Sequence, residues 1–572
     1  MMGGCSPAEV LACLSSPALK CATVSGILTT KPSLIEWVDR NVPGIDVITT
    51  KSYQVMPDAG NREPVLVEAG IGCYGNAVGL RNPGMEKGFD ELLSLRSRHS
   101  MRALLNISLS GNSVDDFALL VKKFEPVADL LELNFSCPHA GEGYGSSIGS
   151  DAALTARYVK ALRALTSKPL FPKLTPNVPS IEAVAVAAMA SGADGIAAIN
   201  TVGPEVYYEP HTGMPILSNP RGHKGGKSGR WILDEALSKI AAIRGEIGPG
   251  APLIGMGGIT TGADVRAMRE AGAQTVGLGS LFIRVPHPVR PAFVKALRDD
   301  TEQGTCLSGE LLINERLMEY RPYKISRREQ KGSDLLLLTL DGACDCRAGE
   351  YVFLWVPGAG EKPFSMAYGN PMTFVIRKRH YDKALEQGIV TEALFSLKVG
   401  DTVLIRGPYG KEGPPCGSST VMVVAGGTGI AVVPALLSML SGKASHIRIY
   451  YGVKRGEEPL FSDLIREYGH LETVADQDEP GAVLGSVSRD LESRKIRPDC
   501  CYNIGPPLLM AEASRLQETA GVRAERIWNS LETHTMCGVG ICGECECGGH
   551  LTCQEGTFVS YAFLQDHGLD LS

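Results

Sequence analysis

The stretch Leu-Leu-Glu-Leu-Asn-Phe-Ser at residues 130–136 is a short apolar run that ends in polar residues. Seven more runs of this kind occur before residue 300, separated mostly by helix-like stretches: 21–26, 46–52, 103–110, 170–176, 195–201, 252–258 and 275–280. Apolar runs that alternate with helical patterns indicate a parallel sheet covered by helices on both faces. Eight such units in about 300 residues are typical of an α/β protein built as a (β/α)8 TIM barrel.

The ends of these runs predict where function lies. Each run finishes in polar or glycine residues: Ser25, Lys51, Asn106, Asn134, Lys173, Asn200, Gly257 with Gly258, and Gly279 with Ser280. A (β/α)8 barrel gathers the carboxyl ends of its strands on one face, where its active site lies. Any one of these residues is explained as a turn, but the whole set, with its lysines and asparagines, favours a site.

The glycines that follow the last two runs predict a phosphate site. Barrels of this type commonly bind phosphate after strands seven and eight. Glycine lets backbone N–H groups approach an anion, and Thr260, Thr261 and Asp264 fit the start of a helix whose dipole favours one. Lys173, further round the rim, would place positive charge near a reduced cofactor ring.

Cys137 follows the run at 130–136 and leaves a thiol at the mouth of the predicted barrel. A buried structural role is the usual fate of such a cysteine. Its position at a strand end favours a reactive thiol instead.

Residues 21–285 resemble the catalytic chain of class 1 dihydroorotate dehydrogenases, which are FMN-containing barrel enzymes. The matching stretches lie at 50–52, 76–84, 134–138, 173–177, 198–201, 225–229, 255–259 and 277–280. The resemblance implies FMN contacts from Ser25, Gly26, Lys51, Asn106, Asn134, Lys173, Ser228, Gly229, Gly257, Gly258, Gly279 and Ser280. It implies substrate contacts from Lys51, Asn76, Gly79, Leu80, Asn134, Asn200 and Thr201. It places Cys137 on the catalytic base.

The chemistry of dihydroorotate oxidation suits these residue types. The substrate loses a proton beside its amide carbonyl, and a thiolate can accept that proton. It loses a hydride from the carbon that bears the carboxylate, and a flavin ring accepts it. Asparagine side chains donate to carbonyls and accept from ring N–H groups, which suits a pyrimidine.

The chain changes character from about residue 311. Short strand-like runs separated by turns predict a small antiparallel barrel, at 334–340, 351–356, 373–377 and 402–406. The stretch Val-Met-Val-Val-Ala-Gly-Gly-Thr-Gly-Ile at 421–430 then reads as a strand, a glycine turn and a helix. With similar strand-then-glycine units at 444–452 and 499–507, it predicts a doubly wound nucleotide domain.

A cysteine motif near the carboxyl terminus predicts a metal cluster. Cys537, Cys542 and Cys545 have the C-x4-C-x2-C spacing of plant-type [2Fe–2S] proteins, and Cys553 follows. Zinc and unbound thiols are the alternatives, and the interleaved glycines disfavour zinc. Cys547 is interpreted as a spare thiol. The pairs Cys344/Cys346 and Cys500/Cys501 are interpreted as structural.

The second half resembles the electron-transfer chain of class 1B dihydroorotate dehydrogenases, a ferredoxin-reductase-like protein that carries FAD, NAD and [2Fe–2S]. The resemblance implies FAD contacts from Lys362, Pro363, Phe364, Ser365, Ile376, Arg377, Thr391 and Gly407. It implies NAD contacts from Gly426, Gly427, Thr428, Gly429, Gly505 and Pro506. What are usually two polypeptides are joined here, in four expected domains: FMN barrel 1–310, FAD barrel 311–415, NAD domain 416–526 and cluster domain 527–572.

The expected reaction is oxidation of dihydroorotate at FMN, with electrons passing through the cluster and FAD to NAD. His139 leaves an alternative, because the family usually has Asn there and the loop resembles dihydropyrimidine dehydrogenases, which act on uracil and thymine. The stretch 76–84 belongs to the orotate enzymes and favours dihydroorotate. Lys362 replaces a family Arg and Ile504 replaces a Cys, so NAD versus another acceptor stays open. An electron-transfer protein with a non-catalytic barrel is the third alternative.

Composition limits the partners. The chain has 572 residues and a formal net charge of −7, without the basic stripe of a nucleic-acid binder. No apolar run reaches the length of a membrane span, and the first residues do not read as a secretory signal. We therefore expect a cytoplasmic protein, where structural disulfides are rare. Apart from the base and the four cluster ligands, the 16 cysteines are expected to be ordinary thiols. The family resemblance implies a homodimer.

Overall fold

The computed structural model describes residues 5–135, 146–220, 222–378, 388–417, 420–476 and 482–571. The chain forms two compact units. The first contains Met1–Leu317 together with Val539–Glu544, and the second contains Met318–Gly538 together with Cys545–Ser572. The predicted division of the second part into three domains stays a prediction.

The first unit is built on a closed eight-stranded barrel, which confirms the predicted architecture. Its neighbouring strands are all parallel and follow the order β1-β12-β11-β8-β7-β6-β5-β2. They are β1 (Lys20–Thr23), β2 (Val47–Thr49), β5 (Leu104–Leu109), β6 (Leu130–Asn134), β7 (Leu170–Lys173), β8 (Ile196–Ala198), β11 (Leu253–Met256) and β12 (Thr275–Leu278). Each coincides with one of the eight apolar runs.

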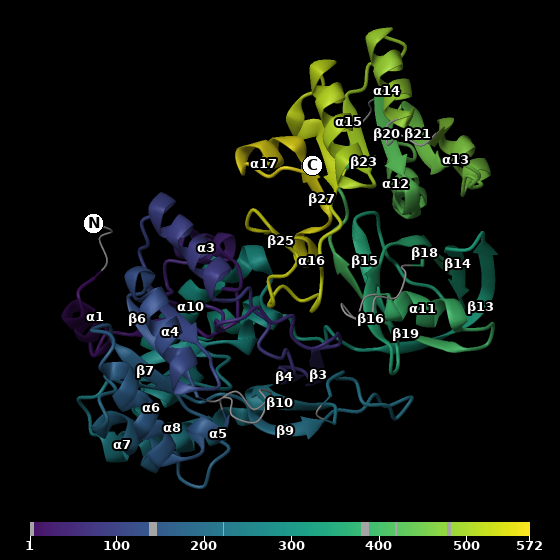
Figure 1. The fold of residues 1–572 in the computed structure, drawn as a ribbon. Helices are drawn as coiled ribbons and strands as arrows, with labels where there is room; N and C mark the ends of the chain where they lie inside the picture. Colours follow the sequence, from purple (N-terminus) through teal and green to yellow (C-terminus); the bar gives the residue numbers. More distant parts are fainter. Residues whose placement is uncertain are drawn as a thin grey trace. The chain divides into compact units, whose positions relative to one another are not determined.

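Helices surround these strands on the outside (Figure 1). They are α2 (Pro32–Asn41), α3 (Met85–Arg98), α4 (Val114–Phe124), α5 (Ser146–Gly149), α6 (Ala152–Arg163), α7 (Ile181–Ala190), α8 (Leu233–Ile247), α9 (Gly262–Glu270) and α10 (Arg290–Gln303). The strands are buried on both faces because the helices cover the outside and the barrel interior is packed; all residues of β5 are buried, for example.

A short helix, α1 (Pro7–Leu14), packs against one end of the barrel interior. The capping pair Ser6 and Glu9 fixes its start. Its buried residues Val10 and Leu14 join a cluster of side chains from the barrel strands, among them Leu104. Strands β2, β5 and β6 contribute to that cluster through their first residues, Val47, Leu104 and Leu130. The opposite end, where the strands finish, is left for a site.

Two long insertions meet beyond the carboxyl ends of the barrel strands. The insertion after β2 forms β3 (Leu66–Gly70) and β4 (Cys73–Asn76), and the insertion after β8 forms β9 (Val202–Val206) and β10 (Lys224–Gly229). They pair as one antiparallel sheet in the order β3-β4-β10-β9. Since both follow strand ends, this sheet belongs to the end of the barrel where the site is predicted.

The second unit begins with a seven-stranded antiparallel sheet. The runs after residue 311 predict antiparallel strands correctly, but the sheet order does not close into the predicted barrel. The sheet order is β16-β15-β19-β13-β14-β18-β17. The strands are β13 (Arg321–Lys331), β14 (Leu335–Leu340), β15 (Glu350–Val356), β16 (Gly360–Phe364), β17 (Met366–Gly369), β18 (Met372–Arg377) and β19 (Thr402–Gly410). One helix, α11 (Ile389–Ser396), packs on β15 and β16.

A six-stranded sheet follows in the order β22-β21-β20-β23-β24-β27. Its pairs are parallel except at the edge strand β27. The strands are β20 (Thr420–Gly426), β21 (His446–Lys454), β22 (His470–Asp476), β23 (Cys500–Ile504), β24 (Ile527–Ser530) and β27 (Phe558–Ser560), and the helices include α12 (Val433–Leu440), α14 (Ala482–Glu492) and α15 (Pro507–Thr519). The order in the chain reverses between β20 and β23, as in doubly wound folds (Figure 1).

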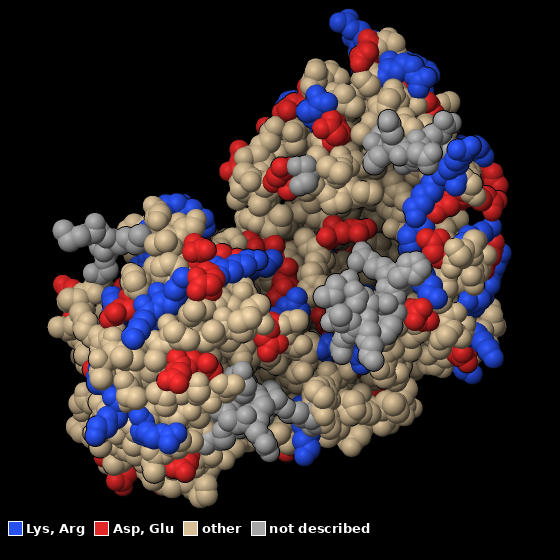
Figure 2. Space-filling model, in the orientation of Figure 1, with Lys and Arg blue, Asp and Glu red and all other residues tan. Residues whose placement is uncertain are grey.

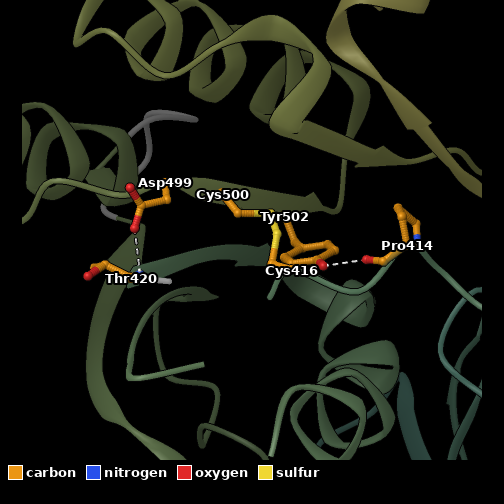
Figure 3. Close-up of a disulfide and its surroundings, with 6 residues drawn as sticks. All are labelled: Pro414, Cys416, Thr420, Asp499, Cys500 and Tyr502. Carbon is orange, nitrogen blue, oxygen red and sulfur yellow. Dashed lines mark hydrogen bonds between the residues drawn. A yellow bond between two sulfur atoms is a disulfide. The ribbon is translucent and has the colours of Figure 1, made fainter. Parts of the chain in front are cut away.

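One expectation about the cysteines is wrong. Cys416 and Cys500 form a disulfide, with Cα atoms 6.3 Å apart and a sequence separation of 84 residues (Figure 3). The chain before β20 lies against β23. Tyr502, on β23, donates a hydrogen bond to the Pro414 carbonyl at 2.6 Å. Pairing at such a separation follows from tertiary structure, so spacing alone does not reveal it. The adjacent Cys501 is a thiol whose pKa is raised by burial.

No helix in the described ranges is long and apolar enough to cross a membrane. On the face drawn in Figure 2, basic and acidic side chains lie next to one another over each unit. This mixed pattern fits a chain with 56 basic and 63 acidic residues.

Candidate functional site

The closed barrel brings the predicted strand-end residues to one end of the first unit. Lys51 follows β2, Asn134 ends β6, Lys173 ends β7 and Asn200 follows β8. The neighbouring strands β6 and β7 pair with Asn134 opposite Lys173. These side chains therefore belong to one rim, which the sequence predicts.

Ser52 is the centre of a hydrogen-bond network on this rim. Its hydroxyl shares hydrogen bonds with Ser25 at 3.1 Å and with Ser108 at 2.9 Å, and it accepts one from Nδ2 of Asn134 at 3.0 Å. One hydroxyl thus connects groups from four neighbouring strand ends. The hydrogen bond to Ser52 limits the orientation of the Asn134 side chain.

Glu132 is a site residue that the sequence analysis missed. Its Oε1 lies 3.9 Å from Nζ of Lys173, and the two side chains are 1% and 7% exposed. Ser108 donates a hydrogen bond to the same oxygen at 2.9 Å. The sequence does contain a sign of this role, because Glu132 is the one charged residue in the apolar run at 130–136. The carboxylate of Glu132 places an opposite charge beside the Lys173 ammonium group.

The rim contains groups that fit a flavin. Asn106 donates through Nδ2 to Oγ1 of Thr49 at 3.1 Å, but its buried Oδ1 has no hydrogen-bond partner among the described residues. A buried acceptor of this kind is able to receive a hydrogen bond from water or from a ligand N–H group, and a flavin ring has such a group. At Gly26, where φ is +80°, a Cβ atom would lie 3.3 Å from Nζ of Lys51. The left-handed backbone favours glycine at Gly26, and the lysine lies close beside it.

In the predicted phosphate region, the backbone at Gly258 and Gly279 lies close to neighbouring residues. A Cβ atom at Gly258 would lie 2.6 Å from Cα of Leu233, and one at Gly279 would lie 2.9 Å from Cγ2 of Val24. The predicted helix start is confirmed, since Thr261 caps α9 in a capping box with Asp264. Asp264 accepts from the backbone N–H groups of residues 260 and 261, at 2.8 Å each. A phosphate would therefore use other amides, those next to the glycines.

Three predicted substrate contacts, Asn76, Gly79 and Leu80, lie on the inserted sheet or in the loop that follows it. Asn76 ends β4, and its Nδ2 donates to the Gly226 carbonyl at 3.4 Å. Gly79 and Leu80 have left-handed backbones, with φ of +81° and +58°. The side chain of Asn82 fixes this loop, because its Nδ2 donates to Gln54 at 2.6 Å and to the Leu80 carbonyl at 2.8 Å.

The other predicted barrel contacts are placed as follows. Ser228 and Gly229 lie on β10, opposite β4. Thr201 follows Asn200 and donates its backbone N–H to that side chain at 2.8 Å. Gly257 precedes Gly258, and Ser280 follows Gly279. Cys137 and His139 lie outside the described residues, so the assignment of the base stays a prediction.

The predicted NAD residues converge at the point where the strand order of the six-stranded sheet reverses. A Cβ atom at Gly505 would lie 3.1 Å from the backbone of Gly426, and one at Gly429 would lie 2.6 Å from the Ile504 carbonyl. A Cβ atom at Gly426 would lie 3.3 Å from Cδ of Pro506, and Gly427 has φ of +55°. Thr428 lies in the same glycine turn. Doubly wound sheets bind nucleotides in the crevice at this point.

The predicted FAD residues are distributed over the seven-stranded sheet. Lys362, Pro363 and Phe364 lie on β16, Ser365 links β16 to β17, Ile376 and Arg377 end β18, Thr391 lies on α11 and Gly407 lies on β19. Arg377 is engaged by two carboxylates, Asp334 at 2.7 Å and Glu457 at 2.9 Å. Thr391 donates to the Gly388 carbonyl at 3.0 Å. An FAD phosphate would have to compete for Arg377, and the FAD site stays a prediction.

Three of the predicted cluster cysteines contact one another in the second unit. Hydrogen bonding to Cys537 and Cys545 raises the pKa of Cys553, and hydrogen bonding to Cys553 lowers that of Cys545. All three are buried. Cys542 lies in the segment that groups with the first unit. No three His, Cys, Asp or Glu side chains of the described ranges are arranged for a single metal ion. A two-iron cluster divides four cysteines between two metals, and this ligand set stays a prediction.

Comparisons with known proteins match the first part of the chain. The family model of dihydroorotate dehydrogenase matches residues 21–298. The catalytic subunit of dihydroorotate dehydrogenase B (NAD(+)) from Pyrococcus furiosus is 37% identical over 256 residues, 45% of this chain and 81% of that protein. The same subunit from Methanocaldococcus jannaschii is 35% identical over 257 residues, 45% of this chain and 81% of that protein. The crystal structure of the Eimeria tenella enzyme with ferulenol is 18% identical, with a TM-score of 0.41, over 51% of this chain and 84% of that one.

Proposed function

The chain belongs to the dihydroorotate dehydrogenase family, and from this we propose that it oxidises dihydroorotate to orotate at FMN in pyrimidine biosynthesis. We further propose that the electrons pass through a [2Fe–2S] cluster and FAD to NAD, all within one chain. The family relatives are NAD-dependent enzymes, which supports NAD as the final acceptor.

The observation that carries this proposal is the rim of the barrel. Ser52 fixes Asn134, and Glu132 lies beside Lys173 within the region that the family model matches. The unpartnered Oδ1 of Asn106 fits a flavin N–H group. We assign FMN to the predicted strand-end residues on these grounds. When bound, FMN supplies the acceptor for the hydride.

The chain's own residues would bind and orient the substrate. Asn134 and Asn200 suit the carbonyl and N–H groups of a dihydropyrimidine. The left-handed loop at Gly79 and Leu80, which Asn82 fixes, turns its backbone sharply next to Asn76. We propose that its amides and Asn76 hold the substrate carboxylate. Cys137 would accept the proton from the ring carbon beside the amide carbonyl.

A second function is favoured by one observation. His139 and the glycines that follow it resemble the dihydropyrimidine dehydrogenases, whose substrates uracil and thymine have no carboxylate. The two substrates differ at the group that we assign to the loop at 76–84. A substrate without a carboxylate would leave that loop without its proposed role, so dihydroorotate remains our first proposal.

The location and the assembly are also proposals. We place the protein in the cytoplasm and expect barrels to pair as a homodimer, both from the sequence. The disulfide between Cys416 and Cys500 is unusual for that compartment. Light scattering of the purified chain at micromolar concentration tests the dimer, and a monomer alone would contradict it.

Anaerobic titration tests the proposed substrate. Dihydroorotate should bleach the flavin absorbance of the purified chain, and orotate should reoxidise flavin that NADH has reduced. Uracil should do neither within the same time. Reoxidation by uracil but not by orotate would favour the second function and contradict the first.

A further inference from the structure

Arg406 on β19 is a buried arginine whose side chain has no solvent exposure. All five of its N–H groups are used. Nε donates to Glu361 at 2.8 Å and Nη2 donates to the other oxygen of Glu361 at 2.6 Å. Nη1 donates to the Tyr409 hydroxyl at 3.0 Å. The two remaining N–H groups go to the backbone of residues 536 and 537.

These last two contacts connect Arg406 to a predicted cluster ligand. Nη1 donates to the carbonyl of Cys537 at 2.8 Å, and Nη2 donates to the carbonyl of Met536 at 3.1 Å. Two donors on consecutive carbonyls fix the backbone on both sides of the Cys537 Cα atom. That backbone determines where the Cys537 sulfur points.

The next residue is held against the same guanidinium. Gly538 has φ of +79°, and a Cβ atom there would lie 3.1 Å from Nη1 of Arg406. The chain thus turns sharply beside the arginine directly after the cysteine. A larger residue would be strained by this backbone conformation and would press on the guanidinium.

The guanidinium is itself fixed in place. Tyr320 donates to Glu361 at 2.6 Å, and burial raises the pKa of that tyrosine, so its hydroxyl keeps its proton. The guanidinium carbon lies 3.8 Å from the centre of the Phe353 ring. The planar guanidinium of Arg406 uses every N–H donor and stacks on a ring. A lysine ammonium group does not reproduce this geometry.

We propose that Arg406, oriented by Glu361, is a positioning residue that fixes Cys537 for binding of a [2Fe–2S] cluster. The proposal rests on the proposed ligand set of Cys537, Cys542, Cys545 and Cys553. Residues that orient metal ligands typically change metal affinity by about 10- to 100-fold when they are replaced. Arg406 would act in this way through the backbone of its ligand.

Two variants test the proposal on the full-length protein. Arg406→Lys keeps the charge and removes the fork. The double variant Arg406→Gln with Glu361→Gln removes both charges together, so that no unpaired carboxylate is left buried. Arg448→Gln is the matched control, because Arg448 also pairs with carboxylates, Asp490 and Glu472, and lies over a tyrosine ring. No hydrogen bond connects Arg448 to residue 536 or 537 among those described.

The measurements are iron per chain, the electron paramagnetic resonance spectrum of the reduced cluster, and the rate of iron loss to a chelator. We expect both Arg406 variants to lose iron about 10- to 100-fold faster and to show shifted g-values, while Arg448→Gln matches the wild type. An unchanged spectrum and rate in both variants would overturn the proposal, as would equal effects in the control. If the wild type binds no [2Fe–2S] cluster, the ligand set itself is wrong.

Discussion

Glu132 and Lys173 face each other inside the barrel, with Oε1 and Nζ 3.9 Å apart. They come from neighbouring strands, and Ser108 on a third strand holds the same carboxylate oxygen. The carboxylate partner limits where the ammonium group of Lys173 can lie. A lysine fixed in this way suits a role beside a ring that gains negative charge on reduction.

Replacement of Glu132 tests this pair. Glu132→Gln preserves the shape and an acceptor for Ser108, but it leaves the buried ammonium of Lys173 without a counter-charge. Breaking a buried pair costs about 3–5 kcal/mol, and we expect a loss of this order in the free energy of unfolding, with weaker FMN retention. Urea denaturation and flavin content measure both. Glu86→Gln is the control, because the Glu86 side chain is 69% exposed and its pair with Lys123 contributes about 1 kcal/mol or less. Equal losses in the two variants would contradict the assigned role.

The glycine crevice of the six-stranded sheet is tested by a pair of alanine substitutions. A Cβ atom at Gly429 would lie 2.6 Å from the Ile504 carbonyl, whereas one at Gly485 meets nothing within 4 Å. We expect Gly429→Ala to raise the KM for NAD and to destabilise by about 1–3 kcal/mol, and Gly485→Ala to do neither.

The assay must separate the two halves of the reaction. Bleaching of the flavin by dihydroorotate should be unchanged in Gly429→Ala, since the barrel belongs to the other unit. An unchanged KM for NAD in this variant would show that NAD does not bind at these glycines. A loss of flavin bleaching would mean that the substitution acts on the whole chain.

The barrel was predictable because one physical pattern repeats eight times along the chain. Its strands are buried on both faces, so each appears as an apolar run that ends in polar residues, and every run became a strand. The glycine turns at Gly426 and Gly505 were predictable for a similar reason, since a strand followed by glycine has a known place in doubly wound sheets.

The residues that sequence reasoning missed act through tertiary contacts. Ser52, Ser108 and Glu132 matter because neighbouring strands bring them together, and their separations in the chain carry no periodic signal. Arg406 contacts residue 537 across 131 positions. The disulfide closes an 84-residue separation and depends on the chain before β20 packing beside β23.

The disulfide gives a prediction about stability. A bridge that closes a loop of this length restricts the unfolded chain, and removing it is expected to cost about 4.5 kcal/mol on the loop-entropy account. Cys416→Ser should therefore lower the unfolding midpoint of the second unit, and reductant should lower that of the wild type but not of the variant. Cys306→Ser, at an exposed cysteine, is the control. Labelling of both Cys416 and Cys500 by a thiol reagent in the unreduced, denatured protein would contradict the bridge.

The assignment of the base is tested by two substitutions at Cys137. Cys137→Ala should retain FMN and lose most turnover, because no group would accept the proton. Cys137→Ser should keep some activity at a higher pH, since a free thiol has a pKa of about 8.5 and a hydroxyl loses its proton far less readily. Turnover is measured against pH with dihydroorotate and an artificial electron acceptor. Full activity in Cys137→Ala would exclude this cysteine as the base.

Formation of NADH from dihydroorotate by the purified single chain tests the central claim most directly. We expect orotate and NADH to form in equal amounts, without any added electron-transfer protein, and to disappear together when the cluster is removed while FMN remains bound. Flavin reduction by dihydroorotate without any NADH would contradict the claim that one chain carries the whole path from substrate to NAD.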